Sequence, residues 1–170
     1  MKKDVVQVEI EIPSDVNVEV NGLDVKMTGP KGTLEKRFKM FDVELNKEDN
    51  KLIVKGKKMM VHTLAAHLHN MIHGVREGFE KKMKMVYSHF PINLEIKDGY
   101  VYIKNFMGEK YPRKVRMIPG VEIDIKAPYL YIRGMDKEAV GQMAASLRSA
   151  TKIRKLDNRV FQDGIYYAID

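Results

Sequence analysis

The chain has 170 residues, contains no cysteine and carries 30 Lys and Arg against 23 Asp and Glu, a formal net charge of +7 at pH 7. The absence of cysteine excludes disulfides, thiolate metal ligands and thiol nucleophiles. With 44% hydrophobic and 31% charged residues, and no apolar run near the roughly 20 residues that a membrane span needs, the sequence predicts a folded cytoplasmic protein without a membrane segment.

Strands open each half of the chain. Apolar and polar residues alternate from Val6 to Ile12 and again from Met83 to Tyr87, which predicts two half-buried strands. The pairs Asn21-Gly22 and Asp98-Gly99 predict tight hairpin turns, because both pairs tolerate the positive φ that such turns require.

One pattern of strands occurs twice. The segment Val-Asn-Val-Glu-Val at 16–20 returns as Ile-Asn-Leu-Glu-Ile at 92–96, an offset of 76 residues. The segment at 52–56 returns at 130–134, an offset of 78. This self-similarity predicts an internal duplication.

Each copy then continues into an amphipathic helix, in which apolar residues recur at spacings of three and four. These residues are Val61, Leu64, Ala65, Leu68, Ile72 and Val75 in the first copy and Val140, Met143, Ala144 and Leu147 in the second. The predicted fold class is α+β, with two tandem duplicated domains, 1–80 and 81–170, each an antiparallel sheet packed against one main helix.

Motifs for catalysis or metal binding are weak. His62, His69 and His73 share one side of the first helix, but no His-Glu-x-x-His pattern occurs, so solvated or interface histidines are favoured over a metal site. The segment 29–32, Gly-Pro-Lys-Gly, lacks the Gly-Lys-Ser/Thr ending of a phosphate loop and predicts a turn that offers Lys31 to a phosphate. Since no nucleophile or acid-base pair converges, we expect no enzyme activity, cofactor or small-molecule substrate.

The net charge belongs to the second domain. Residues 1–80 hold 13 Lys and Arg against 13 Asp and Glu, while residues 81–170 hold 17 against 10. A basic half joined to a neutral half indicates a surface for nucleic acid or another polyanion. A surface that is kept soluble by its charge is the alternative.

Two segments of the second domain mix cations with aromatic residues. The predicted loop 105–116 could bind phosphates while a ring stacks on an unpaired base, or it could be an ordinary basic hairpin tip. After the second helix comes a run of five cations, of which the helix dipole alone accounts for Arg148 and Lys152. An aromatic-flanked turn then ties the tail down or contacts RNA. The candidate RNA-binding residues are Lys110, Arg113, Lys114, Arg148, Lys152, Arg154, Lys155, Arg159, Phe161 and Tyr166.

Five blocks in sequence order resemble the ribosomal large-subunit protein six family, in its archaeal and eukaryotic branch. They are Gly29-Pro30-Lys31-Gly32-Thr33-Leu34, Asn70-Met71-Ile72-His73-Gly74-Val75 with Gly78-Phe79, His89-Phe90-Pro91-Ile92, Asn105-Phe106-Met107-Gly108-Glu109-Lys110 with Arg113, and Arg159-Val160-Phe161-Gln162-Asp163-Gly164-Ile165-Tyr166. Together they span nearly the whole chain.

The resemblance implies a structural component of the large ribosomal subunit that binds large-subunit rRNA, mainly through the second domain, near the region where translation factors dock. It places the family's basic loop on Lys110 and Arg113 and its basic C-terminal stretch on Arg154, Lys155 and Arg159. Neighbouring large-subunit proteins are the other implied partners. A non-ribosomal RNA-binding regulatory protein is the alternative.

Overall fold

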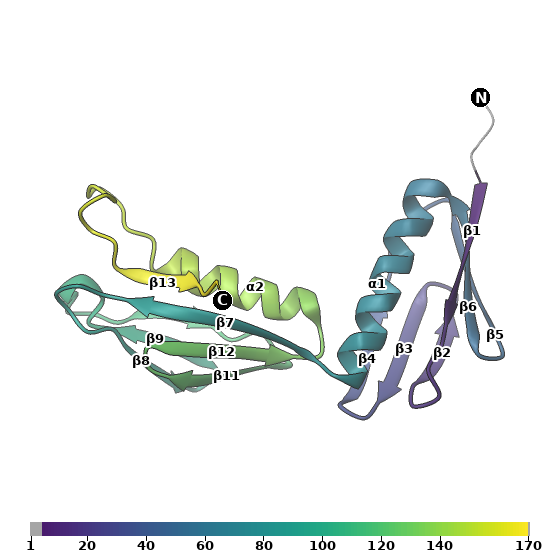
Figure 1. The fold of residues 1–170 in the computed structure, drawn as a ribbon, viewed down its shortest axis with the longest axis horizontal. Helices are drawn as coiled ribbons and strands as arrows, with labels where there is room; N and C mark the ends of the chain where they lie inside the picture. Colours follow the sequence, from purple (N-terminus) through teal and green to yellow (C-terminus); the bar gives the residue numbers. More distant parts are fainter. Residues whose placement is uncertain (1–4, 170) are drawn as a thin grey trace. The chain divides into compact units, whose positions relative to one another are not determined.

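The computed structural model describes residues 5–169, and its contacts divide them into two compact units. Unit 1 runs to Gly78 and includes Met135–Lys137, and unit 2 holds Phe79–Gly134 and the residues from Glu138 onward. Each unit contains antiparallel sheets and one main helix (Figure 1). The predicted α+β class and the duplication are therefore confirmed, although each unit has two small sheets where the sequence predicted one.

Unit 1 builds its core between two three-stranded sheets and one helix. The sheets have the strand orders β1-β6-β5 and β2-β3-β4. The helix buries all six residues of the predicted apolar stripe. The elements are β1 (Val5–Glu11), β2 (Asn17–Asn21), β3 (Asp24–Gly29), β4 (Gly32–Arg37), β5 (Val43–Glu48), β6 (Lys51–Lys57) and α1 (Lys58–Arg76).

Unit 2 repeats this plan and adds one strand. Its sheets have the orders β10-β9-β8 and β11-β12-β7-β13, and the four predicted apolar residues of its helix are buried. The elements are β7 (Phe79–Val86), β8 (Asn93–Lys97), β9 (Tyr100–Lys104), the 3₁₀ turn η1 (Phe106–Gly108), β10 (Arg113–Arg116), β11 (Val121–Lys126), β12 (Tyr129–Gly134), α2 (Lys137–Ala150) and β13 (Gly164–Tyr167). Strand β13 is the added one and has no counterpart in unit 1.

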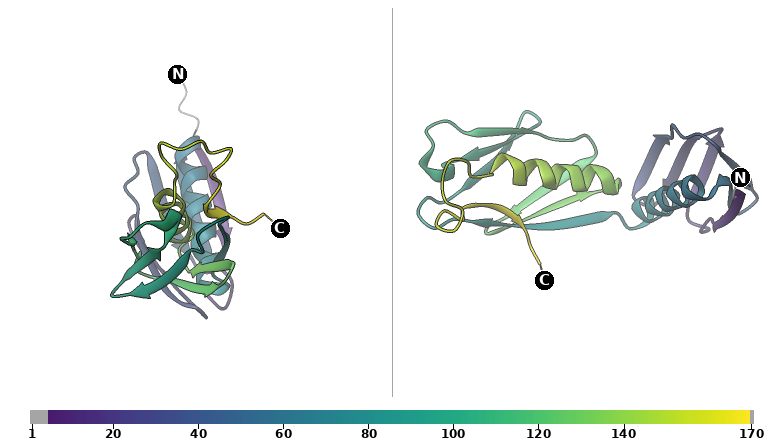
Figure 2. Two further views of the ribbon diagram at one scale, coloured as in Figure 1. Left: turned by 90° about the vertical axis from the view of Figure 1, so that its left-hand side faces the viewer. Right: turned by 90° about the horizontal axis from the view of Figure 1, so that it is seen from above.

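Alternation along the strands decides which side of the four-stranded sheet faces the core of unit 2. Leu130 and Ile132 on β12 are buried in one cluster with Met83 and Met85 on β7 and with the apolar side of α2. Figure 2 shows α2 lying along this sheet. Because successive side chains of a strand point to opposite faces, the residues between these four face away from the helix.

The first hairpin turn lies one residue later than predicted. Asn21 pairs with Asp24, so the loop is Gly22-Leu23, and Gly22 has a φ of 64°. A two-residue loop with glycine first and positive φ at that position alone is typical of a type II′ turn, which explains the shift. The second hairpin turn is Asp98-Gly99 as predicted, and both residues have positive φ.

The predicted loop 105–116 is shorter than expected. Residues Arg113–Arg116 form β10, which pairs with β9 in the smaller sheet of unit 2. Val115 faces the core, so Lys114 and Arg116 project from the opposite side. The period of two in this basic segment accounts for the strand, and it places two cations on a rigid element.

The segment Gly29-Pro30-Lys31-Gly32 is a turn, as predicted. Gly29 pairs with Gly32, and the backbone N–H of Lys31 donates a 2.9 Å hydrogen bond to the carbonyl oxygen of Val75 in α1. A Cβ at Gly29 would lie 2.6 Å from that same oxygen. The turn therefore packs closely against the end of α1, and only glycine fits at its first position.

Candidate nucleic-acid interface

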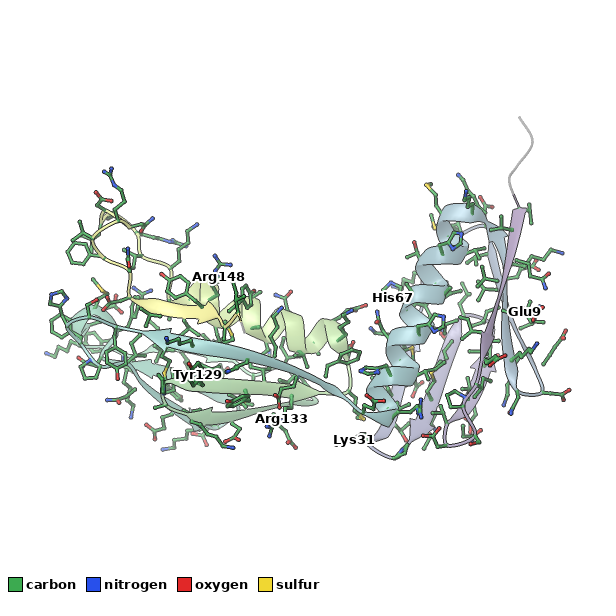
Figure 3. All side chains as sticks on the ribbon, viewed as in Figure 1. Glu9, Lys31, His67, Tyr129, Arg133 and Arg148 are labelled. Carbon is green, nitrogen blue, oxygen red and sulfur yellow. The ribbon has the colours of Figure 1, made fainter. Side chains whose placement is uncertain are left out.

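The candidate cations of unit 2 gather around the C-terminal end of α2. Arg148 and Lys152 line an open groove of ≈ 520 Å³ together with Tyr166 and Tyr167. Lys114 lines a second open groove of ≈ 520 Å³ beside α2. Because Ser149 lines both grooves, they lie on two sides of the last turn of the helix. Figure 3 labels Arg148 on this helix.

The loop of residues 152–163 leaves the helix end and returns to the sheet as β13, and it extends past α2 in Figure 1. Its base is closed by Thr151, which is 2% exposed. The hydroxyl lies 3.2 Å from the carbonyl oxygens of Leu147 and Arg148, and it accepts a 2.9 Å hydrogen bond from the N–H of Ile165. The tail is thus attached to the helix at both of its ends.

Three cations of this tail face solvent. Lys152, Arg154 and Lys155 are exposed and have no acidic partner among residues 5–169. Lys155 has a φ of 66°, a left-handed conformation that turns the chain sharply at the tip. Cations near a helix C-terminus also interact favourably with its dipole. These three side chains are therefore able to bind an external anion.

Arg159 is exposed but already paired. Its side chain is 90% exposed, and its Nε and one terminal nitrogen donate to the carboxylate of Asp157 at 3.2 and 3.1 Å. The backbone N–H of Arg159 donates to the same carboxylate at 2.9 Å. These hydrogen bonds lower the pKa of Asp157. An anion that binds Arg159 would have to compete with this carboxylate.

Arg113 is held by its own unit. Its Nε and one terminal nitrogen donate to the carboxylate of Glu109 at 2.8 and 2.6 Å, and the other terminal nitrogen donates to the carbonyl oxygen of Ala150 at 2.6 Å. The guanidinium also lies 4.4 Å from the centre of the Phe106 ring. Arg113 therefore connects β10 and the loop before it to the last residue of α2.

The aromatic side chains differ in what they can contact. Phe106 is 1% exposed beneath Arg113, so its ring belongs to the core, whereas Tyr111 is 77% exposed and Lys110 stands 6.0 Å from its ring centre. Phe161 is half-buried. Tyr166 is exposed on β13, beside the first groove. Of these four rings, Tyr111 and Tyr166 are the ones that solvent reaches most.

Sequence reasoning missed the residues that hold this region together and a second group of cations and rings on the sheet. Thr151 has no distinctive motif, and its contact with Ile165 depends on a return of the chain 14 residues later. Lys82 and Lys84 alternate with two buried methionines, and Tyr129 and Tyr131 alternate with buried aliphatic residues. That alternation is a signal the sequence could have supplied.

The histidines of the first helix do not form a metal site among the described residues. His62, His69 and His73 are exposed on α1, and His73 Nδ1 lies 3.8 Å from the carboxylate of Glu77. Within residues 5–169 no group of three or more His, Cys, Asp or Glu side chains could hold a metal ion. No helix in the same range is long and apolar enough to cross a membrane.

Comparison with known proteins identifies the family. A family model described as Ribosomal protein L6 matches residues 12–78 and 90–164. The chain is 45% identical to Large ribosomal subunit protein uL6 of Methanothrix thermoacetophila, covering 92% of this chain and 93% of that protein. It is 46% identical to the protein of the same name in Staphylothermus marinus (93% and 91%) and 41% identical to that of Aeropyrum pernix (98% and 96%).

One matched range lies in unit 1 and the other, apart from Met135–Lys137, in unit 2, as a duplication requires. The resemblance that the sequence motifs indicated is thereby confirmed. The chain belongs to the ribosomal protein L6 family.

Proposed function

We propose that the chain is a structural component of the large ribosomal subunit and binds large-subunit rRNA mainly through unit 2. The observation that carries this proposal is the cluster of exposed cations around the end of α2, in the half of the chain that holds the whole net charge of +7. The relatives are large-subunit ribosomal proteins, which supports the expectation that the chain is not an enzyme.

Phosphate contacts explain how such a surface binds. Each Lys or Arg that neutralises a phosphate releases condensed counterions, so affinity depends on salt and hardly on sequence. Lys152, Arg154 and Lys155 are suited to this role because no carboxylate of residues 5–169 pairs with them. Lys114 and Arg116 extend the same charge along the other groove, and Lys110 lies over the exposed ring of Tyr111 in the loop before β10.

Shape provides the specificity. Double-helical RNA hides its base edges in a deep, narrow groove, so proteins recognise its sugars, phosphates and junctions. The walls of the two grooves beside α2 have a fixed geometry, because Arg113 and Thr151 connect β10 and β13 to the end of the helix. In this proposal Arg113 positions its neighbours, and Tyr111 and Tyr166 are the rings that contact RNA. Phe161, half-buried, supports the tail.

The location within the subunit follows the family resemblance. We place the chain near the region where translation factors dock, with other large-subunit proteins as its neighbours. The neutral residues 1–80 would then contact protein neighbours or solvent, and residues 81–170 would contact rRNA.

Removing the tail charges tests this assignment. The triple variant Arg154→Gln, Lys155→Gln and Arg159→Gln should weaken binding to large-subunit rRNA and flatten the dependence of log affinity on log salt, by roughly 0.9 per lost phosphate contact. The matched control is Lys26→Gln, Lys51→Gln and Lys55→Gln in unit 1, where all three side chains are exposed. Lys47 is left unchanged because its Nζ donates to the carbonyl oxygen of Val18.

Two results would contradict the proposal. Equal losses from both triple variants would remove the assignment to unit 2. Failure of the wild-type chain to comigrate with large ribosomal subunits after a high-salt wash would favour the RNA-binding regulator instead.

A further inference from the structure

The four-stranded sheet of unit 2 has one face that neither α2 nor the smaller sheet covers. Its outward residues carry lysines and tyrosines in adjacent rows. Lys126, Tyr129, Lys84 and Tyr166 form one row, since each pairs with the next across β11, β12, β7 and β13. Tyr131 and Lys82 stand opposite each other in the next row. We call these six residues the tyrosine-lysine face; Figure 3 labels Tyr129 on it.

The corresponding sheet of unit 1 provides an internal comparison. At the offset of 78 residues, Tyr129 and Tyr131 correspond to Lys51 and Ile53, which pair with Glu11 and Glu9 on β1. In unit 2 the residues paired with the two tyrosines are Lys84 and Lys82. At these two paired positions β1 thus holds two carboxylates, whereas β7 holds two ammonium groups. This difference is specific to unit 2 and places positive charge on an open sheet.

The lysines of this face lie close to its tyrosine rings. Lys82 Nζ lies 4.5 Å and Lys84 Nζ 5.9 Å from the centre of the Tyr129 ring, and Lys126 Nζ lies 5.8 Å from that of Tyr131. A cation over a ring face is attracted to it, which restricts the side chain to a narrow region. These rings therefore hold ammonium groups in place, and their faces are occupied, which argues against stacking of a base on them.

The ion pairs recorded on this face within residues 5–169 use two carboxylates, those of Glu80 and Asp124. Arg133 bonds to Glu80 and lies near Asp124, and Lys126 pairs with Asp124 at 3.1 Å. Lys84 has no acidic partner among residues 5–169. Lys84 pairs across the strands with Tyr166, the residue that also lines the groove at the end of α2. The face is continuous with the proposed rRNA interface.

We propose that the tyrosine-lysine face is a second contact surface for the rRNA backbone, where ammonium groups and tyrosine hydroxyls bind phosphates. This inference rests on the proposed function and extends it from the tail to the sheet. With strands about 4.8 Å apart, the row from Lys126 to Tyr166 spans about 14 Å, long enough for several contacts. Tyrosine hydroxyls are donors and are among the groups that commonly bind phosphate oxygens.

The test compares charge removal on the two equivalent sheets. The double variant Lys82→Gln and Lys84→Gln and the control Lys51→Gln and Lys55→Gln each remove two positive charges from outward sheet positions. Binding to large-subunit rRNA is measured from low to high salt, together with hydroxyl-radical footprints on the RNA. We expect the unit 2 variant to lower the log-log salt slope by roughly 2 and affinity by roughly three- to ten-fold, with no such change in the control.

A second variant tests the hydroxyls. Tyr129→Phe with Tyr131→Phe keeps the rings under the lysines and should leave the salt slope unchanged, because no charge is lost. We expect a loss of roughly five- to thirty-fold in affinity from two missing hydrogen bonds to phosphates.

The outcomes separate this inference from the proposed function. If the tail triple variant weakens binding and the Lys82/Lys84 variant does not, the inference is overturned and the proposed function stands. If neither variant affects rRNA binding, both are overturned. If the Lys82/Lys84 variant binds naked rRNA normally but is lost from assembled subunits, the face contacts an acidic protein neighbour, which also overturns the inference.

Discussion

The backbone N–H of Ile165 donates a 2.9 Å hydrogen bond to Oγ1 of Thr151, and this contact joins the start of β13 to the end of α2. Both residues are buried. Buried polar groups without partners are costly, so this hydrogen bond is favoured in the folded state. Because Thr151 precedes the basic tail and Ile165 follows it, the bond holds the two ends of the tail together.

Thr151→Ala should therefore destabilise unit 2. The change leaves the N–H of Ile165 without a partner in a buried position, which costs about 1–3 kcal/mol in the free energy of unfolding. Urea denaturation followed by circular dichroism measures this difference. Thr151→Ser keeps the hydroxyl and should lose much less. If the Ala and Ser variants unfold at the same urea concentration, the hydrogen bond does not hold the tail.

Arg113 and the tail cations should give opposite phenotypes. Arg113→Gln removes the bonds to Glu109 and Ala150 and the contact with the Phe106 ring, so it should lower stability by about 1–3 kcal/mol and leave the salt slope of rRNA binding nearly unchanged. Arg154→Gln should leave stability nearly unchanged and reduce the salt slope of rRNA binding, because its side chain is exposed and has no acidic partner among the described residues. Denaturation and salt-dependent binding of both variants provide the check.

If Arg113→Gln reduces the salt slope of rRNA binding more than Arg154→Gln does, Arg113 binds phosphate directly. Arg113→Lys is the useful intermediate. A lysine keeps the charge but lacks the planar guanidinium that bonds to two partners at once. Most of the stabilisation that Arg113 contributes should therefore still be lost.

Much of the fold was predictable because its signals are local. The apolar stripes of α1 and α2 follow a helical period, and all ten residues predicted for them are buried. The offset between copies also predicted the duplication. The hairpin at Gly22 was displaced by one residue because Asn21-Gly22 fits one turn type while Gly22-Leu23 fits another, and only strand register decides between them.

The interface was predictable in composition and less so in detail. The cations of the tail were visible as a charge run, but which ones are paired depends on tertiary contacts. Arg113 meets Ala150 across 37 residues of sequence, and the same guanidinium lies over the ring of Phe106, which is buried in the core. A sequence pattern that shows a basic residue next to an aromatic one cannot distinguish a packed pair from a pair open to RNA.

Acid should weaken the ion pair that positions Arg113. The hydrogen bond from Arg113 lowers the pKa of Glu109. Because the folded pKa lies below the unfolded one, this carboxylate stabilises the fold above its usual pKa of about 4.3, and that contribution is lost as the pH falls through the folded pKa. Carboxyl carbon NMR titration measures the folded pKa directly. In the Arg113→Gln variant the pKa of Glu109 should rise, while that of Asp157, which is lowered by Arg159, should not move.

Two glycine substitutions should shift stability in opposite directions. Gly141 lies inside α2, and a Cβ there would meet nothing within 4 Å, so Gly141→Ala should stabilise unit 2 by about 0.5–1 kcal/mol through the lower entropy cost of ordering alanine in a helix. At Gly29 a Cβ would lie 2.6 Å from the carbonyl oxygen of Val75, so Gly29→Ala should destabilise unit 1 by about 1–3 kcal/mol.

Thermal denaturation of both variants checks the signs. A destabilised Gly141→Ala variant would mean that α2 is more crowded than described, and a neutral Gly29→Ala variant would mean that the turn can move away from α1. Since the Gly29 turn is held to α1 by the Lys31 hydrogen bond, that movement would also break the contact that anchors the hairpin.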